Sequence, residues 1–179
     1  MNSLPRLEAE IQALAEERAR GDAFETAVLA WLPAEPELAL RRAWRWADWP
    51  ERARRHLSAS DDGIDLVAED TDGELVAVQV KFRSDPDRPT TREEAQKSLS
   101  YPDVFDRYLV VSNAWARTRS ATRGLSGEGR LSWVLREELA ASRKAHRLCS
   151  VPWERGSRGP AVTVLGRVPT SPSSRPICH

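Results

Sequence analysis

Residues 63–82 have the sequence GIDLVAEDTDGELVAVQVKF, which predicts two β-strands joined by a tight turn. The strands are expected to cover about 63–68 and 75–82. Side chains alternate between the two faces of a strand. One face of the second strand carries Gln79 and Lys81 next to each other, although a buried strand face is normally apolar. The pattern therefore makes this hairpin the candidate centre of both the fold and the functional site.

The length of the turn decides whether an aspartate joins this polar face. Directly opposed residues in an antiparallel hairpin share a face. A two-residue turn would pair Asp65 with Val80 on the other face. A three-residue loop at 71–73 pairs Asp65 with Gln79, and Gly73 suits the left-handed last position of such a loop. We therefore predict the three-residue loop, or a bulge with the same effect.

The polar face has the groups needed for metal-assisted hydrolysis. The Asp65 carboxylate and the Gln79 amide oxygen are hard oxygen donors of the kind that Mg²⁺ prefers, and the backbone carbonyl of Val80 could add another. Lys81 could orient an attacking water and stabilise charge on a phosphate. Of the 27 basic residues only three are lysines, so a lysine at position 81 favours a specific role. The alternative is a hairpin with one solvated polar face.

Helical and strand patterns continue on both sides of the hairpin. Residues 4–20 predict an amphipathic helix that Gly21 ends, and Asp22 with Glu25 predicts a capping box that begins a second helix. Residues 38–49 fit a strand or a short helix, and the tryptophans are expected in the core. The elements expected later in the chain are a helix at 91–100 with a Thr91–Glu94 capping box, a buried strand at 107–113, helices at 114–124 and 134–146, and an edge strand at 161–168. This order predicts an α/β or α+β sandwich, and we expect the α/β form, a mixed central sheet flanked by helices.

The chain length and composition predict one folded domain. We expect an N-terminal helix at 1–20, a domain at 21–150, and a tail at 151–179 that is rich in Pro, Ser and Arg and largely disordered. The chain has no apolar stretch that predicts a membrane span and no signal peptide, and its two cysteines are isolated, so a cytoplasmic, reduced protein is expected. A zinc site is not expected, because the four candidate ligands do not have the spacing of known zinc sites. These residues are His146, Cys149, Cys178 and His179.

The charges are unevenly distributed although the net charge is zero. Residues 61–100 carry 11 acidic and 5 basic side chains, whereas residues 101–179 carry 6 and 13. An acidic middle beside a basic C-terminal third is compatible with a metal site next to a phosphate-binding surface. The candidates for contacts to nucleic acid are Arg117, Arg119 and Arg123 on the helix expected at 114–124, and Ser112 and Asn113 at the end of the preceding strand. A solvated basic helix face is the alternative.

Asp65 followed by Gln79-Val80-Lys81 resembles the D…(D/E/Q)-x-K signature of the restriction-endonuclease-like, or PD-(D/E)xK, superfamily. The Q-x-K form is similar to the Mrr-like branch. The resemblance extends over roughly residues 20–140 to the N-terminal nuclease module of type ISP restriction–modification and predicted-helicase proteins. The stretches that carry it are GDAFETAVLAWL from residue 21, WADWP from residue 46, the hairpin, and DRYLVVSNAW from residue 106.

This resemblance implies an α-β-β-β-α-β core, Mg²⁺ dependence with Mn²⁺ as a substitute, and DNA as the substrate. Asp65 would bind the metal, Gln79 would complete its ligand shell, and Lys81 would position the nucleophilic water. Glu25 falls where Mrr-like nucleases often place a helical glutamate near the metal, although a capping box would explain it equally well. A glutamine in place of an acid lowers the negative charge of the site, so weaker metal binding is expected.

The expected function is therefore a Mg²⁺-dependent DNA endonuclease that acts as a restriction or anti-phage module. Type ISP proteins carry a helicase and a methyltransferase after the nuclease, so we expect such a component as a partner in trans. Double-strand cleavage would need a homodimer or two copies bound nearby. One alternative is a catalytically silent module that keeps the fold and binds DNA or docks a partner. An RNA substrate is a third possibility.

Overall fold

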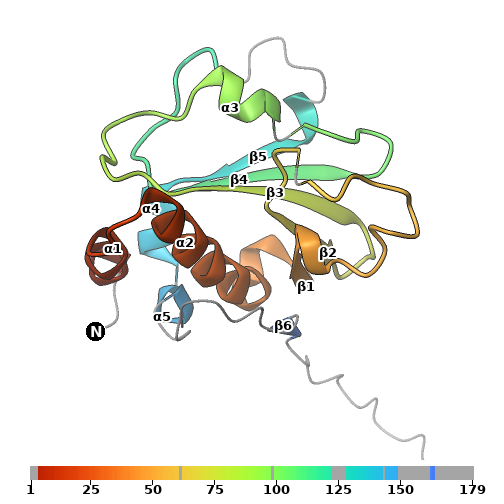
Figure 1. Ribbon diagram of the computed structural model, residues 1–179, viewed down its shortest axis with the longest axis horizontal. Helices are drawn as coiled ribbons and strands as arrows, with labels where there is room; N and C mark the ends of the chain where they lie inside the picture. The colour runs from red at the N-terminus through yellow and green to blue at the C-terminus, as the bar shows by residue number, and fades with distance from the viewer. Residues whose placement is uncertain are drawn as a thin grey trace, which may run out of the picture.

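A mixed six-stranded sheet with the order β5-β4-β3-β2-β1-β6 forms the centre of the protein (Figure 1). The computed structural model describes residues 4–60, 62–97, 99–121, 128–142, 144–148 and 162–163. The strands are β1 (Leu40–Arg45), β2 (Leu66–Asp70), β3 (Leu75–Lys81), β4 (Arg107–Ser112), β5 (Leu131–Val134) and the short β6 (Val162–Thr163). Antiparallel pairing joins β6, β1, β2 and β3, whereas β3, β4 and β5 pair in parallel.

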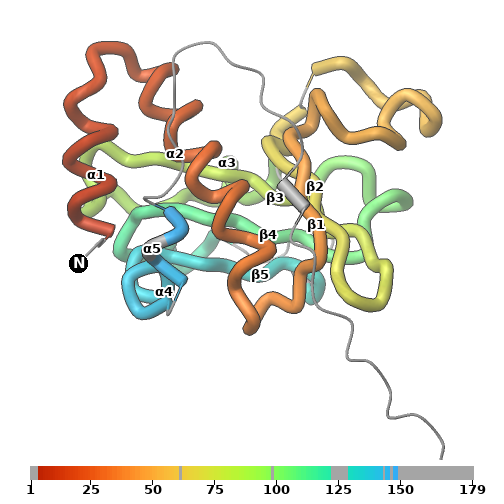
Figure 2. Tube along the Cα trace, turned by 90° about the horizontal axis from the view of Figure 1, so that it is seen from below, coloured from red at the N-terminus to blue at the C-terminus, as the bar shows by residue number. Residues whose placement is uncertain are grey.

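Helices cover both faces of this sheet. The α-helices are α1 (Leu4–Gln12), α2 (Glu17–Trp31), α3 (Arg92–Lys97), α4 (Arg136–Ala141) and α5 (Ala145–Leu148). Short 3₁₀ turns occur at Leu32–Ala34, Pro36–Leu38, Trp46–Asp48 and Glu128–Arg130. Helices α1, α2, α4 and α5 lie on one face, which Figure 2 shows from their side, and α3 lies on the other. None of the helices in the described part of the chain is long and apolar enough to cross a membrane.

Two apolar clusters hold the layers together. On the α2 face, Phe24 and Val28 are fully buried in one cluster with Leu66 and Val78 of the sheet. The opposite face has an aromatic cluster that includes Trp46, Trp49, Ile64, Val67, Ala77, Phe105 and Tyr108. Alternation along β2 and β3 explains the division, because neighbouring residues of a strand face opposite layers. The expected α-β-β-β-α-β order is confirmed as α2, β1, β2, β3, α3 and β4.

The hairpin has the loop length that the sequence predicts. Leu66 lies opposite Val78, and Glu69 lies opposite Leu75. The backbone N–H of Asp70 donates to Glu74 O at 3.0 Å, which leaves the three-residue loop 71–73 between them. Gly73 ends that loop with φ +89°, a conformation that costs glycine little. The prediction of an odd loop is therefore confirmed.

The prediction that a helix ends at Gly21 is wrong. Helix α1 ends at Gln12, and α2 begins at Glu17 and continues through Gly21 to Trp31. A glycine costs a helix about 1 kcal/mol, which is small beside the burial of the apolar face of α2. Asp22 therefore lies inside a helix, and the capping box expected from Asp22 and Glu25 does not form.

The helix expected at 114–124 is also wrong. Residues 114–121 are irregular, because their backbone groups bond to another loop. Trp115 N donates to Pro86 O at 2.9 Å, Thr90 N to Ala116 O at 3.1 Å, and Thr118 N to Thr90 O at 2.9 Å. These bonds between distant segments replace the local bonds that a helix would need. Position 123 lies outside the described residues.

The C-terminal part of the chain divides differently from the prediction. The helix expected at 134–146 is replaced by α4 and α5, and strand β5 before them was not predicted. Within the edge strand expected at 161–168, residues 162–163 pair with β1 as β6. The rest of the expected tail lies outside the described residues, as do Cys149, Cys178 and His179, and the side chain of His146 is not described. Residues 38–49, for which a strand or a short helix is expected, contain a strand, β1, followed by a 3₁₀ turn.

Candidate functional site

A pocket of about 350 Å³ lies between the first half of α2 and the carboxyl end of β3. Its walls come from three segments that the fold brings together: α2, the residue that precedes β2, and the chain leaving β3. The lining residues are Glu17, Arg20, Gly21 and Glu25 of α2, Asp65, and Val80, Lys81, Phe82, Arg83, Ser84, Asp85 and Arg88. The pocket therefore combines carboxylates with a lysine and three arginines.

Asp65 is held tightly against the end of β3. Its backbone N–H donates to Val78 O at 3.0 Å, and its carbonyl accepts from Trp46 N at 3.0 Å. Its carboxylate oxygen Oδ2 accepts the backbone N–H of Val80 at 2.6 Å. These bonds place the Asp65 carboxylate beside Val80, the residue that precedes Lys81 in β3. The hairpin and the turn after β1 therefore fix an acidic group next to the candidate catalytic lysine.

Glu25 contributes a second carboxylate from α2. Its Oε2 lies 3.0 Å from Nη1 of Arg45, whose Nη2 also donates to Thr26 Oγ1 at 2.5 Å. Burial and then the neighbouring charge of Asp65 raise the pKa of Glu25 to about 7, against the opposing effect of Arg45. Because Glu25 lies in the middle of α2, helix capping does not explain it. Two crowded carboxylates in a partly buried pocket are typical of a site that binds a cation.

Gln79 lies beside the pocket without lining it. Its side chain is 1% exposed, and its Oε1 accepts no hydrogen bond from the described protein atoms. Lys81, two residues further along β3, does line the pocket, and its backbone carbonyl accepts Ser112 Oγ at 3.0 Å. The structure thus brings Asp65, Glu25 and Lys81 together, and it leaves the amide oxygen of Gln79 buried without a donor among the described residues.

These oxygen donors fit a divalent cation of the Mg²⁺ type. The described residues contain no group of three or more His, Cys, Asp or Glu side chains arranged for a metal. The donors that line the pocket are instead two carboxylates, from Asp65 and Glu25, and residue Val80, whose backbone carbonyl is a neutral oxygen. Gln79, the residue before Val80, has a buried Oε1 with no hydrogen bond from the described residues. Mg²⁺ commonly binds through one or two carboxylates and keeps several waters. A small set of hard oxygen donors therefore suits this ion better than zinc.

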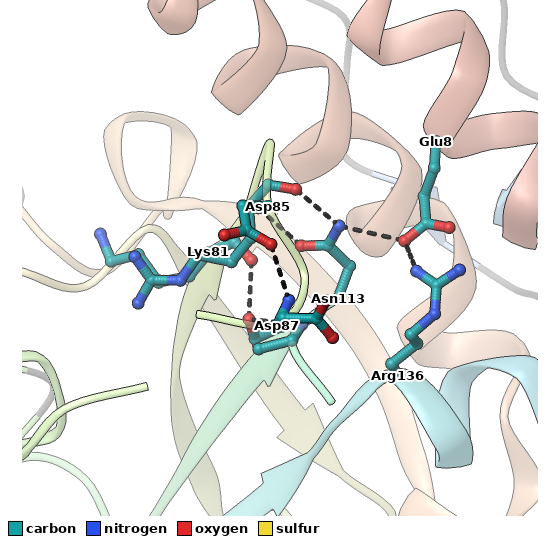
Figure 3. Close-up of polar contacts among 9 residues, drawn as sticks. Glu8, Lys81, Asp85, Asp87, Asn113 and Arg136 are labelled. Atoms are coloured by element: carbon teal, nitrogen blue, oxygen red, sulfur yellow. Dashed lines mark hydrogen bonds and ion pairs between the residues drawn. The ribbon is translucent and has the colours of Figure 1, made fainter. Parts of the chain in front are cut away.

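Ser112 and Asn113 do not face a ligand, contrary to the expectation for phosphate contacts. Both are fully buried. Asn113 Oδ1 accepts Arg83 N at 2.6 Å, and its Nδ2 donates to Arg83 O and to Glu8 Oε1, both at 3.0 Å. Figure 3 shows Asn113 between the chain leaving β3 and Glu8. Polar side chains at the end of a buried strand here hold the neighbouring loop in place.

The arginines that line the pocket are not the arginines that the sequence predicts as contacts to nucleic acid. Arg117 and Arg119 are exposed, and the Arg117 guanidinium lies 5.1 Å from the centre of the Trp133 ring. Sequence reasoning missed Arg20, Arg83 and Arg88, which line the pocket. Arg20 lies five residues before Glu25 in α2, and Arg83 and Arg88 follow Lys81 within seven residues. Closeness in sequence to the candidate site residues is therefore the signal that could have identified these arginines.

Comparison with known proteins identifies the family. The family model Mrr_cat_2, described as restriction endonuclease, matches residues 34–142, which include Asp65 and Lys81. A search of curated proteins gives no match. Among solved structures, the ATP-dependent Type ISP restriction-modification enzyme LlaBIII bound to DNA is similar with a TM-score of 0.58 and 24% identity, over 79% of this chain and 9% of that chain. A repair endonuclease from Pyrococcus abyssi has a TM-score of 0.40 and 21% identity, over 63% of this chain and 45% of that one.

The likeness to the type ISP enzyme concerns the fold, and this chain spans only about a tenth of that protein's length. The family match covers more than half of the chain and agrees with the D…Q-x-K resemblance found in the sequence. This match supports nuclease activity, and the family generally uses divalent metals. The chain belongs to the restriction endonuclease family.

Proposed function

We propose that this chain is a Mg²⁺-dependent DNA endonuclease that acts as a restriction or anti-phage module. The observation that carries the proposal is the meeting of Asp65, Glu25 and Lys81 in one pocket of about 350 Å³. Membership of the restriction endonuclease family supports a nuclease, and the pocket is lined by candidate residues for each part of phosphodiester hydrolysis.

Asp65 and Glu25 would hold the cation, with the backbone carbonyl of Val80, which also lines the pocket, as a neutral oxygen. Gln79 Oε1 would join them only if its buried side chain turned toward the pocket. The hydrogen bond from Val80 N orients the Asp65 carboxylate, and Arg45 orients that of Glu25. When bound, Mg²⁺ (or Mn²⁺) supplies a Lewis acid for the phosphate and a water of lowered pKa. Because Glu25 has a pKa of about 7, it must lose its proton before it can bind a cation at neutral pH.

Lys81 would position the attacking water and stabilise the charge that develops on the phosphate. Its place on β3 is fixed, because its carbonyl accepts Ser112 Oγ from β4. A donor aimed at developing charge in a partly dry site contributes strongly to catalysis. Lysine suits this position because its ammonium is compact.

Arg20, Arg83 and Arg88 would bind the phosphates of the substrate strand. Arg83 is already oriented by an ion pair with Glu94 at 2.5 Å. The Nε of Arg20 is buried without a hydrogen-bond partner in the described part of the chain. A guanidinium with unused donors at the wall of a pocket fits bidentate phosphate recognition.

The type ISP likeness supports a proposal for the wider setting. We propose a helicase or methyltransferase component as the partner of this nuclease domain, a cytoplasmic location, and a homodimer or paired copies where both strands are cut. One observation favours a catalytically silent alternative: Gln79 is buried beside the pocket and is not among its lining residues. In that alternative the chain binds DNA without cleaving it.

Cleavage assays with a matched pair of lysine variants test the proposal. Supercoiled DNA, linear DNA and RNA are incubated with Mg²⁺, Mn²⁺ or EDTA. We expect metal-dependent cleavage of DNA that Lys81→Ala reduces at least about 100-fold and Lys97→Ala leaves unchanged, since Lys97 is exposed on α3. Circular dichroism checks that both variants fold. An unchanged cleavage rate in Lys81→Ala refutes the role of Lys81, and DNA binding without cleavage under any metal favours the silent module.

A further inference from the structure

Trp115 is an exposed aromatic residue whose backbone is bonded to the loop that leaves the proposed active site. It lies three residues after the end of β4, and 56% of it is exposed. No other large apolar side chain of the described residues is exposed. Its backbone N–H donates to Pro86 O at 2.9 Å. Pro86 lies between Asp85 and Arg88, which both line the pocket. This bond joins the backbone of Trp115 to the segment that forms one wall of the pocket.

The Trp115 ring is held in place by a chain of polar contacts. The guanidinium carbon of Arg136 lies 4.7 Å from the centre of the ring. Arg136 forms an ion pair with Glu8, and both side chains are largely buried. Glu8 also accepts Asn113 Nδ2, and Asn113 is bonded to the backbone of Arg83 in the pocket wall (Figure 3). A rigid aromatic side chain binds a ligand at a low cost in conformational entropy.

The surroundings of the ring favour a nucleic acid over a protein partner. A protein interface has a contiguous apolar core, and no second large apolar side chain of the described residues is exposed. Trp115 instead lies in a segment with two exposed arginines, Arg117 and Arg119, and is bonded to the loop that carries the exposed Arg88. An aromatic ring among cations is the arrangement that proteins use to stack bases while they bind the phosphate backbone.

We propose that Trp115 is a stacking site for a nucleobase of the strand that occupies the pocket. The proposal rests on the proposed function for the placement of that strand. A base inside a duplex has both faces covered by its neighbours, so a base on an unpaired strand is the one most freely available to stack on Trp115. The substrate class is therefore nucleic acid that presents single-stranded bases at the cleavage site, such as an opened or displaced strand.

Binding measurements with the full chain test this site. The probes are fluorescently labelled oligo(dT), an abasic strand of equal length, and the oligo(dT)·oligo(dA) duplex, in EDTA so that no metal-dependent cleavage occurs. We expect the wild type to bind oligo(dT) about tenfold more tightly than the abasic strand, the order of one base–aromatic stack. Trp115→Ala should remove this preference, and Trp115→Phe should keep most of it. Trp115→Ala should fold normally because the side chain is exposed.

Three results would overturn the inference: equal binding of oligo(dT) and the abasic strand by the wild type, a base preference that survives in Trp115→Ala, or no binding of any strand. A change from dimer to monomer in Trp115→Ala with unchanged DNA affinity would assign the ring to a protein interface instead. Failure of the stacking site and failure of the nuclease proposal can be told apart. A chain that prefers bases through Trp115 but never cleaves contradicts only the proposed catalysis, and a chain that cleaves with no base preference contradicts only the stacking site.

Discussion

Replacing Glu25 with glutamine should change how the stability of the protein depends on pH. Burial and the charge of Asp65 raise the pKa of Glu25 from 4.5 to about 7. Between these two pH values the carboxyl is ionised in the unfolded chain but protonated in the folded one. Unfolding therefore releases a proton, and the free energy of unfolding falls as the pH rises through this window.

The size of the effect follows from the shift. Each pKa unit corresponds to about 1.4 kcal/mol, so the whole shift amounts to about 3 kcal/mol. This stability is fully present below pH 4.5 and is lost once the pH has passed 7. A glutamine at position 25 carries no charge at any pH. The stability of Glu25→Gln relative to the wild type should therefore rise by about 3 kcal/mol between pH 4.5 and pH 8.

Urea unfolding in EDTA at several pH values between 4.5 and 8, followed by tryptophan fluorescence, measures this difference. Other titrating groups cancel in the comparison of two variants. Glu10→Gln, at a partly exposed position of α1 outside the pocket, is the matched control and should not reproduce this trend. Mg²⁺ should stabilise the wild type more at pH 8 than at pH 5, because ionised Glu25 binds it better. A constant difference in stability between Glu25→Gln and the wild type across this range would refute the reasoning.

Two further substitutions test the fold and the pocket. Gly63→Ala should lower the free energy of unfolding by at least about 2 kcal/mol, because φ is +89° and the new Cβ would lie 2.6 Å from Lys97 O. Gly73→Ala, at the same φ with no neighbour within 4 Å, should cost less, and equal losses in urea unfolding would contradict the contact. Arg20→Ala should weaken DNA binding and reduce the slope of log K against log[salt] by about one, whereas Arg41→Ala, which is paired with Glu69, should not. An unchanged slope would remove Arg20 from the phosphate contacts.

The parts of the fold that follow from local chemistry could be predicted. Gly73 selects the three-residue loop, and strand alternation then fixes the register of the hairpin. The Thr91–Glu94 capping box also forms, since Thr91 N donates to Glu94 Oε2 at 2.8 Å and Thr91 Oγ1 accepts Glu94 N at 3.4 Å. Each of these features is decided by residues that are close in sequence.

The parts that depend on distant segments could not be predicted. Residues 114–121 have helical spacing, but their backbone groups bond to the loop at 86–90, which no local pattern shows. The burial of Asn113 depends on Glu8, more than a hundred positions away. The expectation that tryptophans fill the core is wrong for Trp115, because exposure is decided by what packs around a side chain rather than by its type.

The candidate site shows the same division. Asp65 and Lys81 were found from strand spacing, and Glu25 from the family resemblance; all three line one pocket. Gln79 lies on the same strand as Lys81, but its side chain is buried. The spacing of residues along the strand does not reveal this burial. A period-two pattern gives the face on which a side chain lies, but the layer packed above that face decides whether it reaches a ligand.

The most direct test of the central claim is the initial rate of plasmid nicking as a function of Mg²⁺ concentration, for the wild type and Asp65→Asn. Asparagine keeps the shape of the side chain and an oxygen that can accept from Val80 N, while it removes the charge that would hold the cation. The rate should be zero in EDTA, rise to saturation with Mg²⁺ in the wild type, and stay at least about 100-fold lower in Asp65→Asn. Nicking by the wild type that is equal in EDTA and Mg²⁺, or an Asp65→Asn curve that matches the wild type, would contradict the claim that this pocket is a metal-dependent nuclease site.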